Sequence, residues 1–179
     1  MNILKQFRLF GEYNHLMNGR LYNAASQLSQ DDLCRNRGAF FKSVLGTLNH
    51  ILVGDIIWLK RFSAHPSSKQ SLSCVSDLDM PVSLDAIIFH DLEHLRNERI
   101  KIDDVIIQWI GSLSESDMDD PITYKNMAGI RFTKPFAALI SHLFFHQTHH
   151  RGQVTTLLSQ SGVDFGDTDL IEVIGEIKS

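Results

Sequence analysis

The 179-residue sequence contains few cysteines, few prolines and no long run of apolar residues. Its two cysteines, Cys34 and Cys74, lie far apart and outside any C-x-x-C pattern, which argues against a disulfide framework and favours a reducing compartment. No stretch approaches the roughly 18 consecutive apolar residues of a membrane-spanning helix. Residues 1–15 also lack the apolar run of a signal peptide. We therefore expect a cytoplasmic protein without a membrane partner.

The chain also has no excess of basic residues. Its formal net charge is −4 and its pI is near 6.1, whereas a nucleic-acid-binding face is usually marked by clustered Lys and Arg. Nucleic acid is therefore not an expected partner. With 43% apolar residues, the chain is long enough to bury a sizeable core, and we expect one domain over residues 1–179.

Helical periodicity of apolar residues is the main structural signal in the sequence. It covers four segments that no interior proline interrupts, namely residues 2–29, 39–62, 83–113 and 134–161. Ser83 is the expected N-cap of the third helix, and Gly162 is the expected end of the fourth. These patterns predict an all-α protein that folds as an antiparallel four-helix bundle.

The connections between these segments differ in length and composition. Residues 63–83 form a long serine-rich loop between the second and third helices, which would permit a crossover. Two short β-prone runs, residues 122–124 and 130–132, predict a hairpin before the fourth helix. A short closing helix is expected at residues 169–177.

The predicted fourth helix contains four of the nine histidines: His142, His146, His149 and His150. At about 100° per residue, His146 and His150 lie about 40° apart on one helical face. This H-x3-H spacing can offer two imidazoles to one metal ion. Residues 135–163 contain no Asp or Glu, so a metal bound here would take nitrogen ligands from this helix.

A third ligand would have to come from another helix that faces the same interior. His50 is the best candidate, because it lies midway along the largely apolar second helix. A buried histidine needs a hydrogen-bond partner or a metal, so a hydrogen bond to a backbone carbonyl remains the alternative. Gly46 and Gly54 on the same helix are expected to allow close approach of another backbone.

Two other metal-site patterns are weaker. His90, Glu93 and His94 match the H-x-x-E-H spacing of inverzincin metalloproteases, but the apolar stripe through Leu92 and Leu95 places them towards the flank of their helix. We interpret the match as chance. A ferritin-like di-iron site needs inward glutamates on the bundle helices, and the acid-free fourth helix excludes it.

Three motifs together resemble the DinB (damage-inducible) family of metal-binding four-helix bundles. They are Tyr13-Asn14…Asn18-x-Arg20-Leu21, Leu48-Asn49-His50-Ile51 followed by Trp58-Leu59, and His142-x3-His146-x2-His149-His150-Arg151-Gly152-Gln153. The resemblance covers nearly the whole chain and implies that His50, His146 and His150 are the metal ligands. It also implies packing or supporting roles for His142 and His149, and a homodimer whose helix-face contact Gly152 would fit.

The expected function follows from an open three-histidine site. Such a site would hold one divalent ion per chain, with zinc, nickel, iron and copper all suited to imidazole. The family resemblance suggests a metal-dependent thiol S-transferase or a hydrolase-like enzyme, with a small-molecule substrate and a low-molecular-weight thiol as cosubstrate. Asp55, Asn14 and Gln153 lie near the motifs without an assigned role. The alternative is a non-catalytic dimeric bundle with a structural metal or hydrogen-bonded core histidines.

Overall fold

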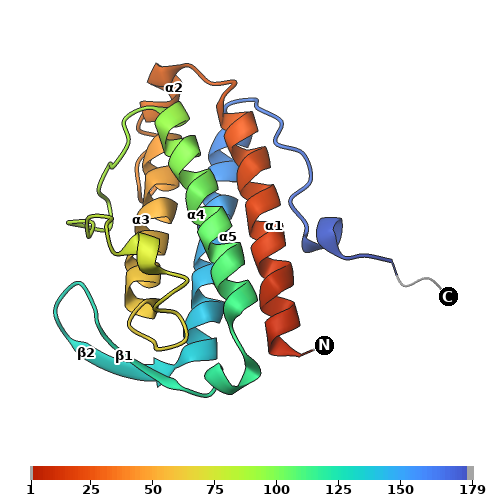
Figure 1. Ribbon diagram of the computed structural model, residues 1–179. Coiled ribbons are helices and arrows are strands. Elements are labelled where there is room, and N and C mark those ends of the chain that lie inside the picture. The colour runs from red at the N-terminus through yellow and green to blue at the C-terminus, as the bar shows by residue number, and fades with distance from the viewer. Residues whose placement is uncertain (1, 177–179) are drawn as a thin grey trace.

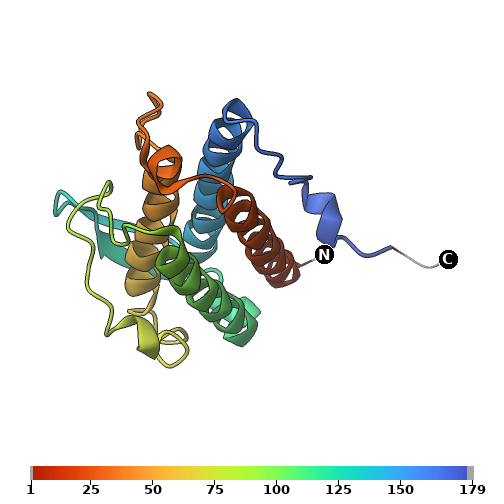
Figure 2. The ribbon, with the colours of Figure 1, turned by 90° about the horizontal axis from the view of Figure 1, so that it is seen from above.

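Four long helices pack side by side as a bundle in this computed structural model, which describes residues 2–176 (Figure 1). They are α1 (Ile3–Ala25), α3 (Val44–Phe62), α4 (Leu92–Ser112) and α5 (Phe136–Gln160). The predicted all-α four-helix bundle is therefore confirmed. Seen from above, the four helices stand at the corners of a square, with α1 diagonally opposite α3 (Figure 2). No helix of the described chain is both long and apolar enough to cross a bilayer.

The long connection between α3 and α4 is a crossover. It runs back along the bundle, so that α3 and α4 point in the same direction while α1 and α5 point in the other (Figure 1). Helix α3 therefore lies antiparallel to α5, and α1 lies antiparallel to α4. The antiparallel α3–α5 pair is the one that matters for function, because it brings residues near the start of α3 to the second half of α5.

The smaller elements lie at the ends of the bundle. A short helix, α2 (Gln30–Cys34), follows α1, and the antiparallel hairpin of β1 (Pro121–Lys125) and β2 (Arg131–Pro135) precedes α5, as predicted. The 3₁₀ helices are η1 (Ser73–Val75), η2 (Glu115–Asp117) and η3 (Leu170–Val173). The last replaces the helix expected at residues 169–177, of which residue 177 lies outside the described residues.

Helix α4 begins at Leu92, about nine residues later than predicted, and Ser83 is not its N-cap. The side chain of Asp91 caps it instead by accepting a hydrogen bond from the backbone N–H of His94 at 2.9 Å. The preceding segment is kept out of the helix by Asn49 of α3, whose Oδ1 accepts the backbone N–H groups of Ile88 and Phe89. A side chain that binds backbone donors in this way competes with helix formation.

Helix α3 begins at Val44 and not at residue 39. The side chain of Ser43 caps it by accepting the N–H of Gly46 at 2.9 Å. Lys42 has a φ of 67°, a left-handed conformation that a helix cannot continue through. As a result Phe41 lies outside the helix and is free to pack across the face that carries His50.

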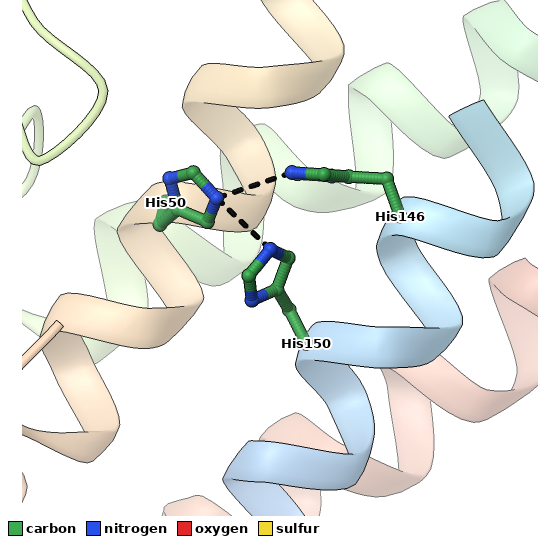
Figure 3. A group of neighbouring side chains, drawn as sticks. All are labelled: His50, His146 and His150. Atoms are coloured by element: carbon green, nitrogen blue, oxygen red, sulfur yellow. Dashed lines mark hydrogen bonds between the residues drawn. The ribbon is translucent and has the colours of Figure 1, made fainter. Parts of the chain in front are cut away.

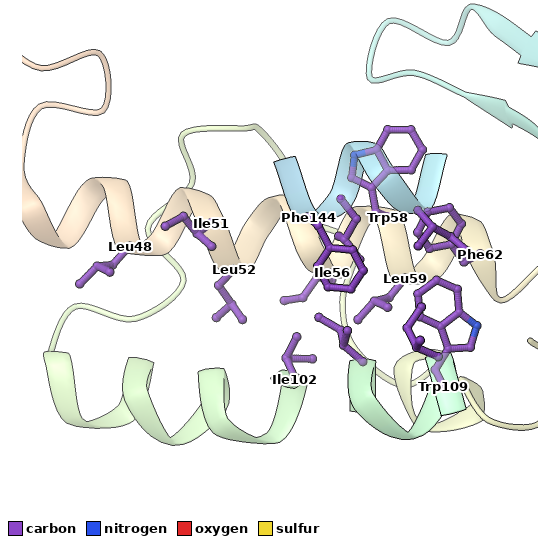
Figure 4. Packing of buried hydrophobic residues seen from close by; sticks show 14 of the residues in the cluster. Leu48, Ile51, Leu52, Ile56, Trp58, Leu59, Phe62, Ile102, Trp109 and Phe144 are labelled. Atoms are coloured by element: carbon purple, nitrogen blue, oxygen red, sulfur yellow. The ribbon is translucent and has the colours of Figure 1, made fainter. Parts of the chain in front are cut away.

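The core is formed mainly by α3, whose side chains are buried along nearly the whole helix. In the close view, Leu48, Ile51, Leu52, Ile56 and Leu59 of α3 lie between the neighbouring helices, with Ile102 and Trp109 of α4 beneath them (Figure 4). Each such side chain contributes about 1.5–3 kcal/mol when fully buried. This packing holds α3 rigidly against its neighbours.

The core also contains a charged network that sequence reasoning did not identify. Arg99 of α4 is 2% exposed and pairs with the fully buried Asp55 of α3 and with Asp103, the latter at 2.9 Å. Asn18 of α1 donates to the Asp103 carboxylate at 3.0 and 3.1 Å. Arg151 of α5 donates to Asn14 of α1. The signal available in the sequence was an aspartate within an otherwise apolar helix.

Candidate metal centre

Three histidines from two antiparallel helices point towards one another (Figure 3). The Nε2 atom of His50 on α3 lies 3.1 Å from the Nε2 atom of His146 and 3.1 Å from that of His150, both on α5. His50 and His150 are buried, while His146 is partly exposed. The structure therefore brings together the three residues that the sequence predicted as ligands.

Hydrogen bonds determine which ring nitrogens of His50 and His150 carry the proton. His50 Nδ1 lies 2.7 Å from the backbone carbonyl of Leu84, which can only accept. His150 Nδ1 lies 2.8 Å from Oε1 of Gln153, whose amide nitrogen in turn faces His149. Both rings therefore carry their proton on Nδ1, as assigned from the network, and present a lone pair at Nε2.

His146 fits against α3 because Gly54 has no side chain. A Cβ atom at residue 54 would lie 2.7 Å from Cε1 of His146, which is closer than real contacts allow. The expectation that Gly54 admits another backbone is thus wrong, since it admits an imidazole ring. The Nδ1 atom of His146 is buried and has no hydrogen-bond partner among the described residues.

The surroundings keep these rings neutral. Burial lowers the pKa of His50 from 6.5 to about 4, assisted by nearby His150 and opposed by the hydrogen bond to Leu84. Burial, followed by the neighbouring imidazoles, lowers the pKa of His146 to about 3. Phe41 contributes by stacking on His50, with ring centroids 3.6 Å apart. Neutral imidazole is the form that binds metal.

The geometry matches the needs of a metal ion. Two nitrogen ligands at about 2.0–2.1 Å from a tetrahedral ion lie about 3.3 Å apart, which is close to the two 3.1 Å separations. The ligand atoms of His50, His146 and His150 all lie within 4.8 Å of one another, and residues 2–176 contain no other such cluster of histidine, cysteine and carboxylate groups. This group could hold a metal ion.

The orientation of the ligands is supported by groups outside the triad. The Leu84 carbonyl and the Gln153 amide fix the rings of His50 and His150, an arrangement common around metal-binding histidines. Gln153 was expected near the site without a role, whereas Phe41 and Leu84 were expected inside helices that in fact begin only at Val44 and Leu92. No short motif would have revealed them.

A pocket of about 450 Å³ adjoins the triad. His50 and His146 line one side of it, and Trp58, Arg61 and Met127 line the rest. His142 also lines it, with its ring centroid 5.0 Å from that of Trp58. Both outer histidines of α5 are exposed, but His142 faces this pocket while His149 bonds to Gln153.

The competing sequence patterns do not form sites among the described residues. His90 and His94 are both exposed, and His90 precedes the start of α4, so the two do not share a helical face. His94 bonds instead to Asp91 at 2.8 Å. Cys34 and Cys74 are exposed free thiols. The interpretation of the H-x-x-E-H spacing as chance agrees with these positions.

Comparison with known proteins gives one family and one curated relative. The sequence model described as the DinB family matches residues 2–174. The protein named "Protein DinB" from Bacillus subtilis (strain 168) is 22% identical over 163 residues, which cover 91% of this chain and 90% of that protein. No solved structure matches the chain.

Proposed function

This chain belongs to the DinB family, and on that premise we propose that His50, His146 and His150 bind one divalent transition-metal ion through their Nε2 atoms. We further propose that the site is catalytic and acts on a small molecule held in the adjoining pocket. The expected chemistry is a metal-dependent thiol S-transferase or a hydrolase-like reaction. Zinc, nickel and iron are the expected metals, because all three accept imidazole ligands.

One observation carries the proposal. The Nε2 atoms of His50 and His150 face each other at 3.1 Å, although both rings hold their proton on Nδ1. Two lone pairs at this separation repel, and a cation between them removes the repulsion. Because both Nδ1 protons are already bound by acceptors, moving a proton to Nε2 would break a buried hydrogen bond.

A core cluster held by hydrogen bonds alone accounts for less of the geometry. A proton on Nε2 of His146 could be donated to His50 across 3.1 Å. The Nε2 atom of His150 would still face the acceptor Nε2 of His50 at 3.1 Å. We therefore favour a metal over hydrogen-bonded core histidines.

The pocket favours a catalytic over a structural metal. A structural zinc site has all four positions filled by protein ligands, whereas a catalytic site has three protein ligands and an open position. His50 and His146 line the pocket, so a small molecule there reaches the ligand side of the triad. A bound divalent ion would supply Lewis acidity, which lowers the pKa of a metal-bound water towards neutral and deprotonates a metal-bound thiol.

The residues of the chain hold this arrangement in place. The Leu84 carbonyl and the Gln153 side chain hold the Nδ1 protons of His50 and His150, which leaves the Nε2 lone pairs of both rings available to a metal. Phe41 covers the His50 ring and excludes water from its face. The buried rings resist protonation, so the ligand nitrogens stay available at neutral pH. No acid or base for the reaction is assigned.

Elemental analysis of untagged protein tests the proposal. We expect about one divalent ion per chain in the wild type, and none in His146→Ala. His142→Ala is the matched control, because His142 lies one turn earlier on the same face of α5 but outside the triad, and it should keep its metal. Equal metal content in wild type and His146→Ala would refute the site. A screen of thiol cosubstrates, with loss of activity on chelation and return on metal addition, would then test catalysis.

The homodimer stays a prediction. Phe145 of α5 is 64% exposed, and Gly152 is exposed two turns further along the same helix. An exposed apolar side chain and a small residue on one face of a helix suit a helix-face contact. Cytoplasmic location and the use of a low-molecular-weight thiol likewise remain predictions.

A further inference from the structure

Arg61 lies in the last turn of α3 and lines the pocket beside the triad. It shares one face of the helix with His50, Gly54 and Trp58, because successive members of this series are four, four and three residues apart. His142 of α5 lies between the triad and Trp58, because the centroid of its ring is 5.9 Å from that of His146 and 5.0 Å from that of Trp58. The pocket therefore extends from the metal ligands to a guanidinium group.

Two aromatic rings hold the Arg61 guanidinium. Its central carbon lies 4.6 Å from the centroid of the Trp58 ring and 4.9 Å from that of Tyr124 in β1. In each contact the cationic carbon lies over the face of an aromatic ring, and the two rings are inclined at 62° to each other. The two rings therefore fix the position of the guanidinium, while its N–H donors, which lie in the plane of the group, make no hydrogen bond to either ring.

Those donors have no partner in the described chain. Arg61 forms no ion pair with any acid of residues 2–176, and its side chain donates no hydrogen bond there. No Asp or Glu of the described residues lines the pocket. The side chain is nevertheless half-buried, and burial lowers its pKa. A half-buried guanidinium without a counter-charge in the described chain keeps its donors available to a group bound in the pocket.

The other walls of the pocket are mostly apolar, with Asn126 and His142 as the further polar side chains. Ile57, Leu84 and Met127 line it together with Trp58. A volume of about 450 Å³ falls in the range of small-molecule sites, which combine mostly apolar walls with a few fixed polar groups. The pocket thus offers one positive group opposite the triad and an apolar surface between them.

We propose that this pocket binds a small organic anion, with the guanidinium of Arg61 holding its carboxylate or comparable oxyanion and the apolar walls holding its body. The proposal rests on the proposed function, because it takes the anion to be the substrate of the three-histidine site. Arg61 would be a substrate-binding residue that determines specificity. An unpaired planar guanidinium suits bidentate recognition of a carboxylate.

Calorimetric titration with benzoate tests the proposal, with benzamide as a neutral probe of nearly the same shape. Wild-type protein with its metal content measured is compared with Arg61→Met, which keeps the apolar stem, and with Arg61→Lys, which keeps the charge. Arg8→Met on the exposed face of α1 is the matched control. We expect Arg61→Met to weaken benzoate binding by about 10-fold or more, Arg61→Lys to weaken it less, and benzamide binding to change little in either.

Equal benzoate affinity in wild type, Arg61→Met and Arg61→Lys would overturn the proposal. Benzoate binding that survives in Arg61→Met but is lost in His146→Ala would also overturn it, because the carboxylate would then depend on the metal site. The near-ultraviolet circular dichroism of each variant checks that the fold is retained, and Arg61→Lys supplies the comparison should Arg61→Met misfold.

The two proposals fail in different measurements. Metal content of the wild type and of His146→Ala decides the proposed function and does not involve benzoate. Metal bound at the triad without any dependence of benzoate binding on Arg61 would refute the anion site alone. Arg61-dependent benzoate binding in a protein that carries no metal would refute the metal site while leaving an anion pocket.

Discussion

His50 and His150 face each other through Nε2 atoms 3.1 Å apart, while each ring gives its Nδ1 proton to a different acceptor. The acceptors come from unrelated places, a backbone carbonyl in the α3–α4 crossover and an amide one turn further along α5. Both therefore orient the lone pairs before any ligand is bound. The folding of these segments therefore positions the proposed ligand atoms before a metal binds.

Gln153→Ala should weaken metal binding, because it removes the acceptor that fixes the His150 ring. Loss of such a supporting hydrogen bond typically costs about 10- to 100-fold in metal affinity. Competition with a chelating dye measures the change. Thr156→Ala, on the exposed side of the same helix, should have no effect, and unchanged affinity in Gln153→Ala would show that the bond is unnecessary.

Gly54→Ala should displace His146, because the new Cβ would lie 2.7 Å from its Cε1 atom. We expect loss of metal from the protein together with a lower free energy of unfolding. Gly19→Ala in α1 is the matched control, because a Cβ there meets nothing within 4 Å, and it should stabilise the helix by about 0.5–1 kcal/mol. Metal retained at full occupancy in Gly54→Ala would mean that the ring has room to move.

The helices and the triad were predictable from sequence because both depend on local periodicity. His146 and His150 share a face at a spacing of four residues, and His50 lies in an apolar helix that must be buried. In any bundle where these two helices pack together, the three rings meet in the same interior. The three expected metal ligands could therefore be predicted without knowing how the loops fold.

The rest of the site depends on chain segments without periodicity. Leu84 and Phe41 reach His50 from the crossover and from the turn before α3. The late start of α4 depends on Asn49, whose side chain binds backbone groups of residues 88 and 89. Long-range contacts of this kind leave no pattern in a single sequence. Asp55 within an apolar helix indicates a buried charge, but its partner Arg99 could not be identified from the sequence.

The metal-free protein should lose stability as the pH falls. The pKa of His50 is lowered from 6.5 to about 4 in the folded protein, and that of His146 to about 3, so the unfolded chain binds protons more readily. The stability that these two neutral histidines contribute is therefore complete above pH 6.5, the pKa in the unfolded chain. It is lost as the pH decreases towards 4. Urea unfolding at several pH values measures it.

The variant His146→Asn should show a shallower pH dependence of its free energy of unfolding, because it has one fewer buried ring to protonate.

The same lowered pKa values mean that protons compete for the ligand nitrogens of a bound metal only at lower pH. Imidazoles of ordinary pKa would release metal between roughly pH 6 and 5, and we expect release from this site below that interval. Metal content after dialysis at successive pH values tests this, and complete release above about pH 5 would contradict it.

Arg99→Met should destabilise the fold more than any surface substitution. It leaves the buried carboxylates of Asp55 and Asp103 without their cation, and breaking a buried pair in this way costs about 3–5 kcal/mol. Arg96→Met, one turn earlier on α4 and bonded to the exposed Asn23, should change the free energy of unfolding by about 0.5 kcal/mol or less. Urea unfolding followed by circular dichroism compares the two.

Adding Asp55→Asn to Arg99→Met should recover part of this loss, because the amide removes one of the two unpaired charges left beside α3 and α4. The double-mutant cycle then yields a coupling energy between Asp55 and Arg99, which residues in one network show and distant residues do not. Additive losses would mean that water reaches the carboxylates once Arg99 is gone. The ion pair would then position α4 against α3 without contributing to stability.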